Sequence, residues 1–135
     1  MIKIDWKALR DDDPDWNYRG CLYAYLTTNS KEILYIGKAW GVTVRSRWSR
    51  SGKEKFWDDL ETQRKIYKHI PIIGKLRLPS RQRLTAQLLA DVESLLIGME
   101  EPWGNIQSRD TRISRPGMTV ECSGKWPGRK VYHDK

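Results

Sequence analysis

Cysteine is scarce in the sequence, which contains only Cys21 and Cys122. The two lie far apart and neither belongs to a CxxC pair, so neither a disulfide framework nor a zinc site is expected. Long apolar runs are also missing, since none approaches the roughly 18 residues that a membrane-spanning helix needs. The N-terminal stretch MIKIDWKALRDDD lacks the pattern of a signal peptide. We therefore expect a cytoplasmic protein without a membrane partner.

Internal repeats and low-complexity tracts are absent as well. The chain has 135 residues, of which 39% are hydrophobic and 31% charged, which is typical of a single domain with its own core. The acidic run DDDPD at residues 11–15 looks like a metal cluster, but adjacent side chains rarely converge on one ion. Because Asp and Pro are common turn formers, we expect a loop or a helix cap here.

Positive charge is in excess. Lys and Arg number 25 against 17 Asp and Glu, which gives a net charge of +8. The excess is marked at the C-terminal end, where residues 106–135 hold seven basic and three acidic residues. This balance favours contact with a phosphate backbone, and the seven Trp and six Tyr could stack on exposed bases. The alternative is a basic surface that serves solubility, with the tryptophans in the core.

Two short segments, CLYAYL at 21–26 and EILYIG at 32–37, are rich in aromatic and aliphatic residues. The turn residues TTNSK separate them, so we predict a β-hairpin. If the loop has an odd number of residues centred on Asn29, Tyr23 lies directly across from Tyr35 and both phenols project from one face. An even loop would separate the two phenols.

Further elements are expected along the chain. A helix can begin after Thr43 as N-cap, and a second helix is predicted over 54–65 (EKFWDDLETQRK). The segment 69–78 (HIPIIGKLRL) is predicted to be a strand, and its internal Pro71 and Gly74 favour an edge or bulged position. Near the C-terminus, TVECSG and RKVYHD could form a small hairpin.

The clearest helix is predicted over 81–97, and Gly98 and Pro102 are expected to end it. Glu93 lies at the margin of its apolar stripe. A carboxylate in that position reaches solvent at the rim, pairs with a cation, or binds a metal. The stripe has helical spacing and consists of Leu84, Leu88, Val92, Leu95 and Met99.

Motif residues in order resemble those of the GIY-YIG nuclease family. The triplet YIG is intact at 35–37, and CLY at 21–23 stands where the family usually has Gly-Ile-Tyr. Lys38 recurs in the branch of the family that includes the nucleotide-excision-repair endonuclease. Five motif residues of the family have counterparts in the same order and with compatible spacing. They are Tyr23, Tyr35, Arg45, Glu93 and Asn105 of PWGN.

The resemblance covers about residues 20–106 and implies a stand-alone catalytic domain. The fold that it implies is α+β, with a small central three-stranded antiparallel β-sheet flanked by helices. Residues 1–135 would then form a single domain, with 20–106 as its nuclease-like core and 107–135 as a basic C-terminal extension. This extension would either clamp the phosphate backbone or pack on the nuclease.

The resemblance further implies a divalent-metal-dependent endonuclease that hydrolyses phosphodiester bonds in DNA. One Mg²⁺ or Mn²⁺ ion would be held by Glu93, because magnesium keeps several waters and binds through few carboxylates. Arg45 would contact the scissile phosphate through its planar guanidinium. Asn105 would position Glu93 or a backbone turn.

Water activation would fall to Tyr23 or Tyr35. A phenol has a pKa near 10 and is a poor base at neutral pH unless nearby cations stabilise its phenolate. Lys38, Arg45 and the metal ion are the cations expected to supply that field.

One position departs from the family pattern. Many members carry His or Tyr four residues after the arginine, and here Ser49 stands in that place. Arg47 is a competing match for the arginine, but Ser51 follows it at the same distance. His69 could supply the missing group from another element. The departure supports an alternative function, a nucleic-acid-binding module that keeps the GIY-YIG fold without catalysis.

Overall fold

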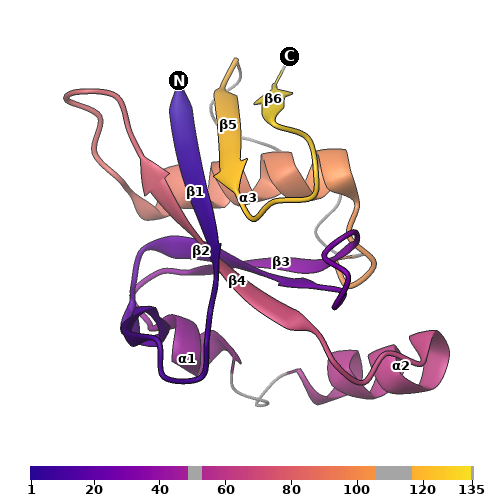
Figure 1. Cartoon of the computed structure of the whole chain (residues 1–135). Coiled ribbons are helices and arrows are strands. Elements are labelled where there is room, and N and C mark those ends of the chain that lie inside the picture. The colour runs from indigo at the N-terminus through magenta and orange to yellow at the C-terminus, as the bar shows by residue number, and fades with distance from the viewer. Residues whose placement is uncertain (49–52, 106–116, 135) are drawn as a thin grey trace.

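A computed structural model describes residues 1–48, 53–105 and 117–134. Its centre is a six-stranded mixed sheet with the order β3-β2-β4-β1-β5-β6 (Figure 1). The predicted three-stranded sheet is therefore wrong, because β2, β3 and β4 form only one end of a larger sheet. The strands are β1 (Ile2–Ala8), β2 (Cys21–Leu26), β3 (Ile33–Ala39), β4 (Ile70–Arg77), β5 (Thr119–Gly124) and β6 (Val131–His133).

Helices cover both faces of the sheet. The longest, α3, contributes its apolar side to one core, while α1, α2 and the 3-10 turn η1 contribute to a second core on the opposite face (Figure 1). The helices predicted after Thr43 and over 54–65 are confirmed. No helix in the described part of the chain is long and apolar enough to cross a membrane. The bounds are η1 (Pro14–Asn17), α1 (Val44–Trp48), α2 (Glu54–Arg64) and α3 (Ala86–Glu100).

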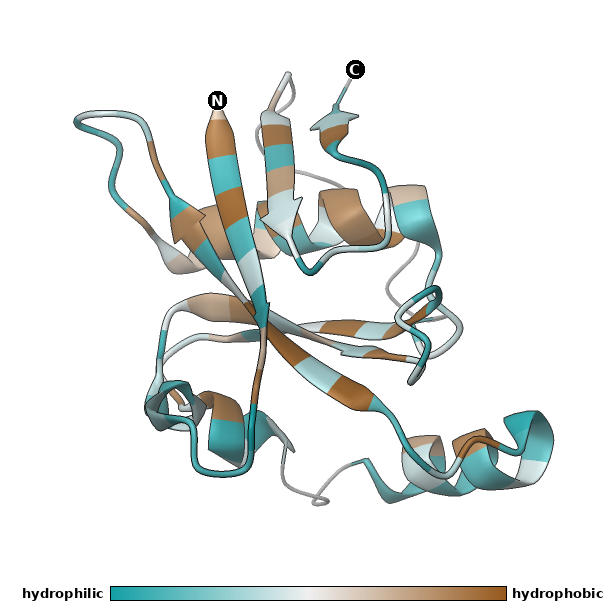
Figure 2. Ribbon diagram, in the orientation of Figure 1, coloured by the Kyte–Doolittle hydropathy of each residue, from teal (hydrophilic) through white to brown (hydrophobic). Residues whose placement is uncertain are grey.

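The strand β1 has no counterpart among the predicted elements, although the sequence carries its signal. Ile2, Ile4 and Trp6 are buried and alternate with the exposed Lys3 and Lys7, as the alternating bands in Figure 2 show. This period of two is the pattern of a strand with one buried face. β1 pairs antiparallel with β4 and parallel with β5, so it joins the predicted part of the sheet to the C-terminal strands.

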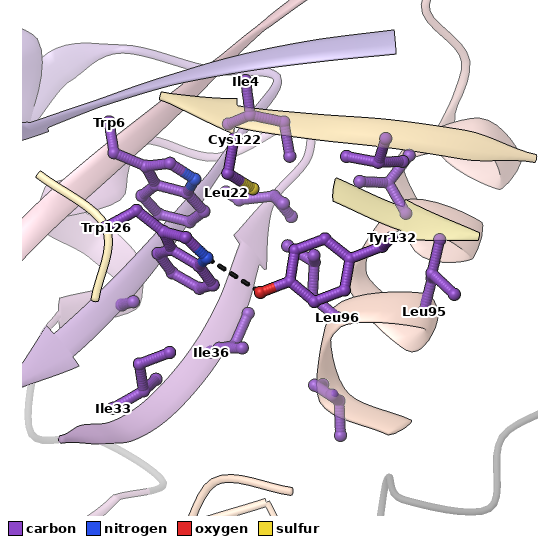
Figure 3. Close-up of a cluster of buried hydrophobic side chains, with 14 of the residues drawn as sticks. Ile4, Trp6, Leu22, Ile33, Ile36, Leu95, Leu96, Cys122, Trp126 and Tyr132 are labelled. Atoms are coloured by element: carbon purple, nitrogen blue, oxygen red, sulfur yellow. Dashed lines mark hydrogen bonds between the residues drawn. The ribbon is translucent and has the colours of Figure 1, made fainter. Parts of the chain in front are cut away.

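The C-terminal strands belong to the main core. Trp126 stacks on Trp6 of β1 with ring centroids 4.3 Å apart, and its Nε1 donates a hydrogen bond of 2.9 Å to Tyr132 Oη (Figure 3). Tyr132 Oη in turn donates to Glu100 Oε2 on α3 at 2.6 Å. The small hairpin expected from TVECSG and RKVYHD is confirmed as β5 and β6. Residues 117–134 therefore complete the sheet.

β4 lies between β2 and β1 and pairs with both in regular register, so the predicted edge or bulged position is wrong. Gly74 is needed there because a Cβ would lie 2.8 Å from both Trp6 Cζ3 and Ile4 Cγ2. Pro71 is tolerated in this central strand because its nitrogen faces the side on which β1 has already ended, so no strand hydrogen bond is lost there. Its carbonyl, on the same side, accepts a hydrogen bond of 2.9 Å from Leu9 N.

α3 begins later than predicted. Arg81 takes a φ of 72°, which interrupts a helix, and Thr85 then acts as N-cap by accepting a hydrogen bond of 3.0 Å from Leu88 N. Gly98 lies inside the helix and does not end it. The chain leaves the helix at Glu101, which takes a left-handed φ of 47°.

The acidic run at 11–15 is a helix cap, as predicted. Asp13 Oδ1 accepts a hydrogen bond of 2.9 Å from Asp15 N at the start of η1. Asp15 also forms ion pairs with Lys7 at 2.7 Å and Lys75 at 2.9 Å. These pairs tie η1 to β1 and β4.

Most tryptophans pack in the protein interior rather than forming a stacking surface. Trp48 and Trp103 are half-buried, and Trp40, directly after β3, is 42% exposed. The buried members are Trp6, Trp16, Trp57 and Trp126.

Candidate active site

The strands β2 and β3 hold the predicted tyrosines. Tyr25 lies opposite Tyr35 and Tyr23 lies opposite Gly37, so the prediction that Tyr23 directly faces Tyr35 is wrong. A register irregularity between Tyr25 and Leu26 accompanies the shift. Because the shift equals the side-chain period of two, Tyr23 and Tyr35 still share a face. Their ring centroids are 6.2 Å apart, which confirms the shared face.

Gly37 makes room for the phenol of Tyr23. A Cβ at residue 37 would lie 2.4 Å from Tyr23 Cζ and 2.5 Å from its Oη, far inside van der Waals contact. The phenol therefore lies over the backbone of β3, which is an edge strand. The glycine of the YIG motif thus sets the position of the tyrosine hydroxyl from within the strand.

Lys53, the residue before α2, lies against these tyrosines and was not among the predicted site residues. Its Nζ donates a hydrogen bond of 2.9 Å to Tyr23 Oη and lies 5.4 Å from the ring centroid of Tyr35. It also donates to the carbonyl of Arg47. Burial, with added repulsion from Arg47, lowers the pKa of Lys53 to about 8. No motif marks this lysine, since the stretch KEK at 53–55 reads as an ordinary helix start.

The surroundings of both phenols favour their protonated form. Burial raises the pKa of Tyr23 and of Tyr35, and in each case the attraction of Arg47 only partly opposes the effect of burial. The attraction of Arg47 alone therefore does not favour a phenolate, and the field expected from Lys38, Arg45 and the metal ion stays a prediction. A protonated phenol can still take part in general-base chemistry if it passes its own proton to a neighbouring group.

Glu93 of α3 forms an ion pair with Lys38 of β3. Lys38 Nζ lies 3.2 Å from Glu93 Oε1, and the two side chains are 39% and 15% exposed. Burial raises the pKa of Glu93, while the positive charges of Lys38 and Arg47 oppose that rise. The sequence left three roles open for Glu93: contact with solvent at the rim, pairing with a cation, or metal binding. The structure contains the ion pair, which connects α3 to the edge strand that carries the YIG motif.

The two arginines of α1 have different surroundings. Electrostatic attraction to Tyr23 is the largest influence on Arg47 and raises its pKa, and Glu93 adds a smaller contribution in the same direction. Arg45 instead lies over the ring of Trp16, with its Cζ 5.6 Å from the centroid. Arg47, the competing match in the sequence, is therefore the arginine that the fold brings to the tyrosines.

Asn105 binds the outer edge of β3. Its Oδ1 accepts from Ile36 N at 2.8 Å, and its Nδ2 donates to Ile36 O at 2.8 Å. Gly104 N donates to Leu34 O, also at 2.8 Å. Asn105 was expected to position either Glu93 or the backbone. Among the described residues it contacts the backbone and makes no contact with Glu93.

His69, which could supply the group of the missing His or Tyr, lies among aromatic rings in the described part of the chain. Ser49 and Ser51 lie outside the described residues. His69 packs among aromatic rings, stacked on Trp57 with centroids 4.6 Å apart and 5.7 Å from Tyr25. Burial lowers the pKa of His69, as for a neutral packed imidazole.

The donor set limits which metal could bind. Within residues 1–48, 53–105 and 117–134, no group of three or more His, Cys, Asp or Glu side chains converges. A single carboxylate such as Glu93 fits Mg²⁺, which keeps several waters and completes its coordination with phosphate oxygens, and does not fit a closed zinc site. An ion there would share the carboxylate with Lys38, so its binding without nucleic acid should be weak.

A scan against protein-family models finds no match, and searches of curated proteins and of solved structures find no similar chain. The chemistry of the site is therefore inferred from its own residues.

Proposed function

We propose that the protein is a divalent-metal-dependent endonuclease of the GIY-YIG type that hydrolyses phosphodiester bonds in DNA. The observation that carries this proposal is the convergence of two phenols, three cations and one carboxylate from separate elements at the edge of the sheet. The net charge of +8 agrees with a phosphate-rich substrate. The converging residues are Tyr23, Tyr35, Lys38, Arg47, Lys53 and Glu93.

Arg47 supplies positive charge for the phosphate, and Lys38 supports the carboxylate of Glu93. The guanidinium of Arg47 can offer two donors to phosphate oxygens, which suits charge that develops on them in the transition state. Lys38 acts through Glu93, because its charge opposes the effect of burial and favours the ionised carboxylate. Glu93 would hold one Mg²⁺ or Mn²⁺ ion, which would neutralise charge on the phosphoryl and leaving oxygens.

Tyr23 and Lys53 form the proton relay. With a pKa of about 8, Lys53 has a substantial neutral fraction at slightly alkaline pH, and its neutral amine can accept a proton from Tyr23 Oη across the 2.9 Å contact. Tyr23 Oη takes the proton of the attacking water as it loses its own. The water oxygen then attacks phosphorus, and the leaving oxygen departs on the opposite side. Tyr35, on the same face, would orient the water.

A panel of nucleic acids tests the proposal. Supercoiled plasmid, linear duplex, flap, single-stranded DNA and RNA are incubated with the protein in Mg²⁺ or Mn²⁺, and cleavage ends are mapped. Nicking of DNA that stops with EDTA is the expected result, and cleavage confined to RNA would overturn the choice of DNA.

A further inference from the structure

A hollow lies next to the cluster formed by Tyr23, Tyr25 and Tyr35. It has a volume of about 300 Å³ and is lined by Asp11, Trp16, Arg45 and Trp48. Trp48 forms the shared wall, because its ring also packs edge-on against Tyr25 with centroids 4.4 Å apart. A nucleotide close to the scissile phosphate could therefore reach this hollow.

The hollow brings together opposite charges that have not paired. Asp13 and Asp15, in the same acidic run, form ion pairs with Lys7. Among the described residues, Asp11 has no such pair, and Arg45 has only its contact with the ring of Trp16. A carboxylate and a guanidinium thus line one aromatic hollow, and each keeps its hydrogen-bonding groups available.

Trp16 is buried in the floor of the hollow, and the half-buried Trp48 offers the exposed aromatic surface. An exposed part of an aromatic ring beside a free acceptor and a free donor is a feature of a nucleobase site. Arg45 can give two hydrogen bonds to O6 and N7 of guanine, the pairing that suits a guanidinium best. Asp11 can accept from N1–H and the N2 amino group, two adjacent donors that only guanine offers on one edge. The N1–H of guanine is occupied in a base pair, so the ligand must be unpaired.

We propose that this hollow binds one unpaired guanine of the nucleic-acid substrate. The proposal rests on the nuclease function above and narrows its substrate to DNA that presents an unstacked guanine near the cut. Arg45, which the motif spacing assigned to the scissile phosphate, becomes a residue that recognises a base.

Binding without cleavage tests this proposal. The Glu93→Gln protein in EDTA is titrated with a fluorescent oligothymidylate and with the same oligomer carrying one central guanine, and anisotropy is recorded. The guanine should tighten binding by about fivefold or more. Replacement by inosine, which lacks the N2 amino group, should remove part of that gain, and annealing to a complementary strand should remove it all.

Asp11→Asn and Arg45→Ala should each abolish the preference for guanine. Asp12→Asn and Arg77→Ala make the same charge changes at exposed positions outside the hollow, and both should keep the preference. Equal binding of the guanine-containing and all-thymidine oligomers by the Glu93→Gln protein would overturn the guanine site and leave the nuclease proposal standing. No binding of any oligomer at low salt would overturn both.

Discussion

Replacement of Gly37 by alanine tests whether the hydroxyl of Tyr23 must lie where the fold holds it. The new Cβ would lie 2.4 Å from Tyr23 Cζ and 2.5 Å from Oη, whereas carbon atoms in contact are separated by about 3.5–4.0 Å. The phenol must therefore move by roughly 1 Å. Tyr23 is only 1% exposed, so it has little room to swing aside.

The expected effect on stability differs from that on activity. Overpacking of this kind costs about 1–3 kcal/mol of unfolding free energy, which urea denaturation would measure. A displacement of about 1 Å can lower a catalytic rate by about 100-fold, because Tyr23 Oη would lose its 2.9 Å contact with Lys53. The rate is measured as single-turnover nicking of supercoiled plasmid in Mg²⁺ at a temperature where the variant is folded.

Gly74→Ala is the matched control. Its Cβ would meet Trp6 and Ile4 at 2.8 Å, in the core on the α3 side of the sheet, so it should lose similar stability and keep most of its nicking rate. Full activity of a folded Gly37→Ala protein would refute the role of Tyr23 in the relay. Equal losses of activity in both variants would show that the effect is one of stability alone.

Three further predictions concern Lys53 and Asn105. The nicking rate should rise with pH and reach a plateau above the Lys53 pKa of about 8. The Lys53→Gln protein should nick slowly and lack this rise. The same pH profile in Lys53→Gln as in the wild-type protein would exclude Lys53 as the base. Since the unfolded pKa of lysine is near 10.4, the folded protein binds fewer protons between about pH 8 and 10, so urea denaturation should find stability rising with pH in that window and a smaller rise in Lys53→Gln. The same slope in both proteins would contradict the shifted pKa. Asn105→Ala leaves the N–H and C=O of Ile36 unpaired and should lower the unfolding free energy, measured in urea, by about 2–3 kcal/mol. The control Asn17→Ala, at an exposed position, should change it little. A loss for Asn105→Ala no larger than that for Asn17→Ala would show that the edge of β3 does not depend on Asn105.

The sequence predicts local elements of this fold better than it predicts their neighbours. The β2–β3 hairpin, α1 and α2 follow from apolar periodicity, turn residues and caps, which are local signals. The place of β4 in the sheet does not, because Pro71 and Gly74 indicate an edge until Trp6 is known to pack over Gly74. The alternation in β1 is readable, but its parallel pairing with β5 joins the two ends of the chain and leaves no local signal.

In the candidate site, too, local sequence signals predict some residues, and the tertiary fold determines the others. Motif spacing finds Tyr23, Tyr35 and Glu93, but it cannot separate Arg45 from Arg47, which differ only in the direction they take from a short helix. Lys53 is invisible to the motif because its importance comes from burial against three tyrosine rings. Side-chain direction and burial are properties of the tertiary fold.

The most direct test of the central claim is Mg²⁺-dependent nicking of supercoiled plasmid by the wild-type protein beside Glu93→Gln, with Glu61→Gln on the exposed side of α2 as control. We expect the wild-type and Glu61→Gln proteins to nick DNA at similar rates. Glu93→Gln should fold normally by circular dichroism and lose nicking. Nicking that survives in Glu93→Gln would contradict the metal site, and a wild-type protein that binds DNA in a salt-sensitive way without cutting any substrate would contradict the nuclease itself.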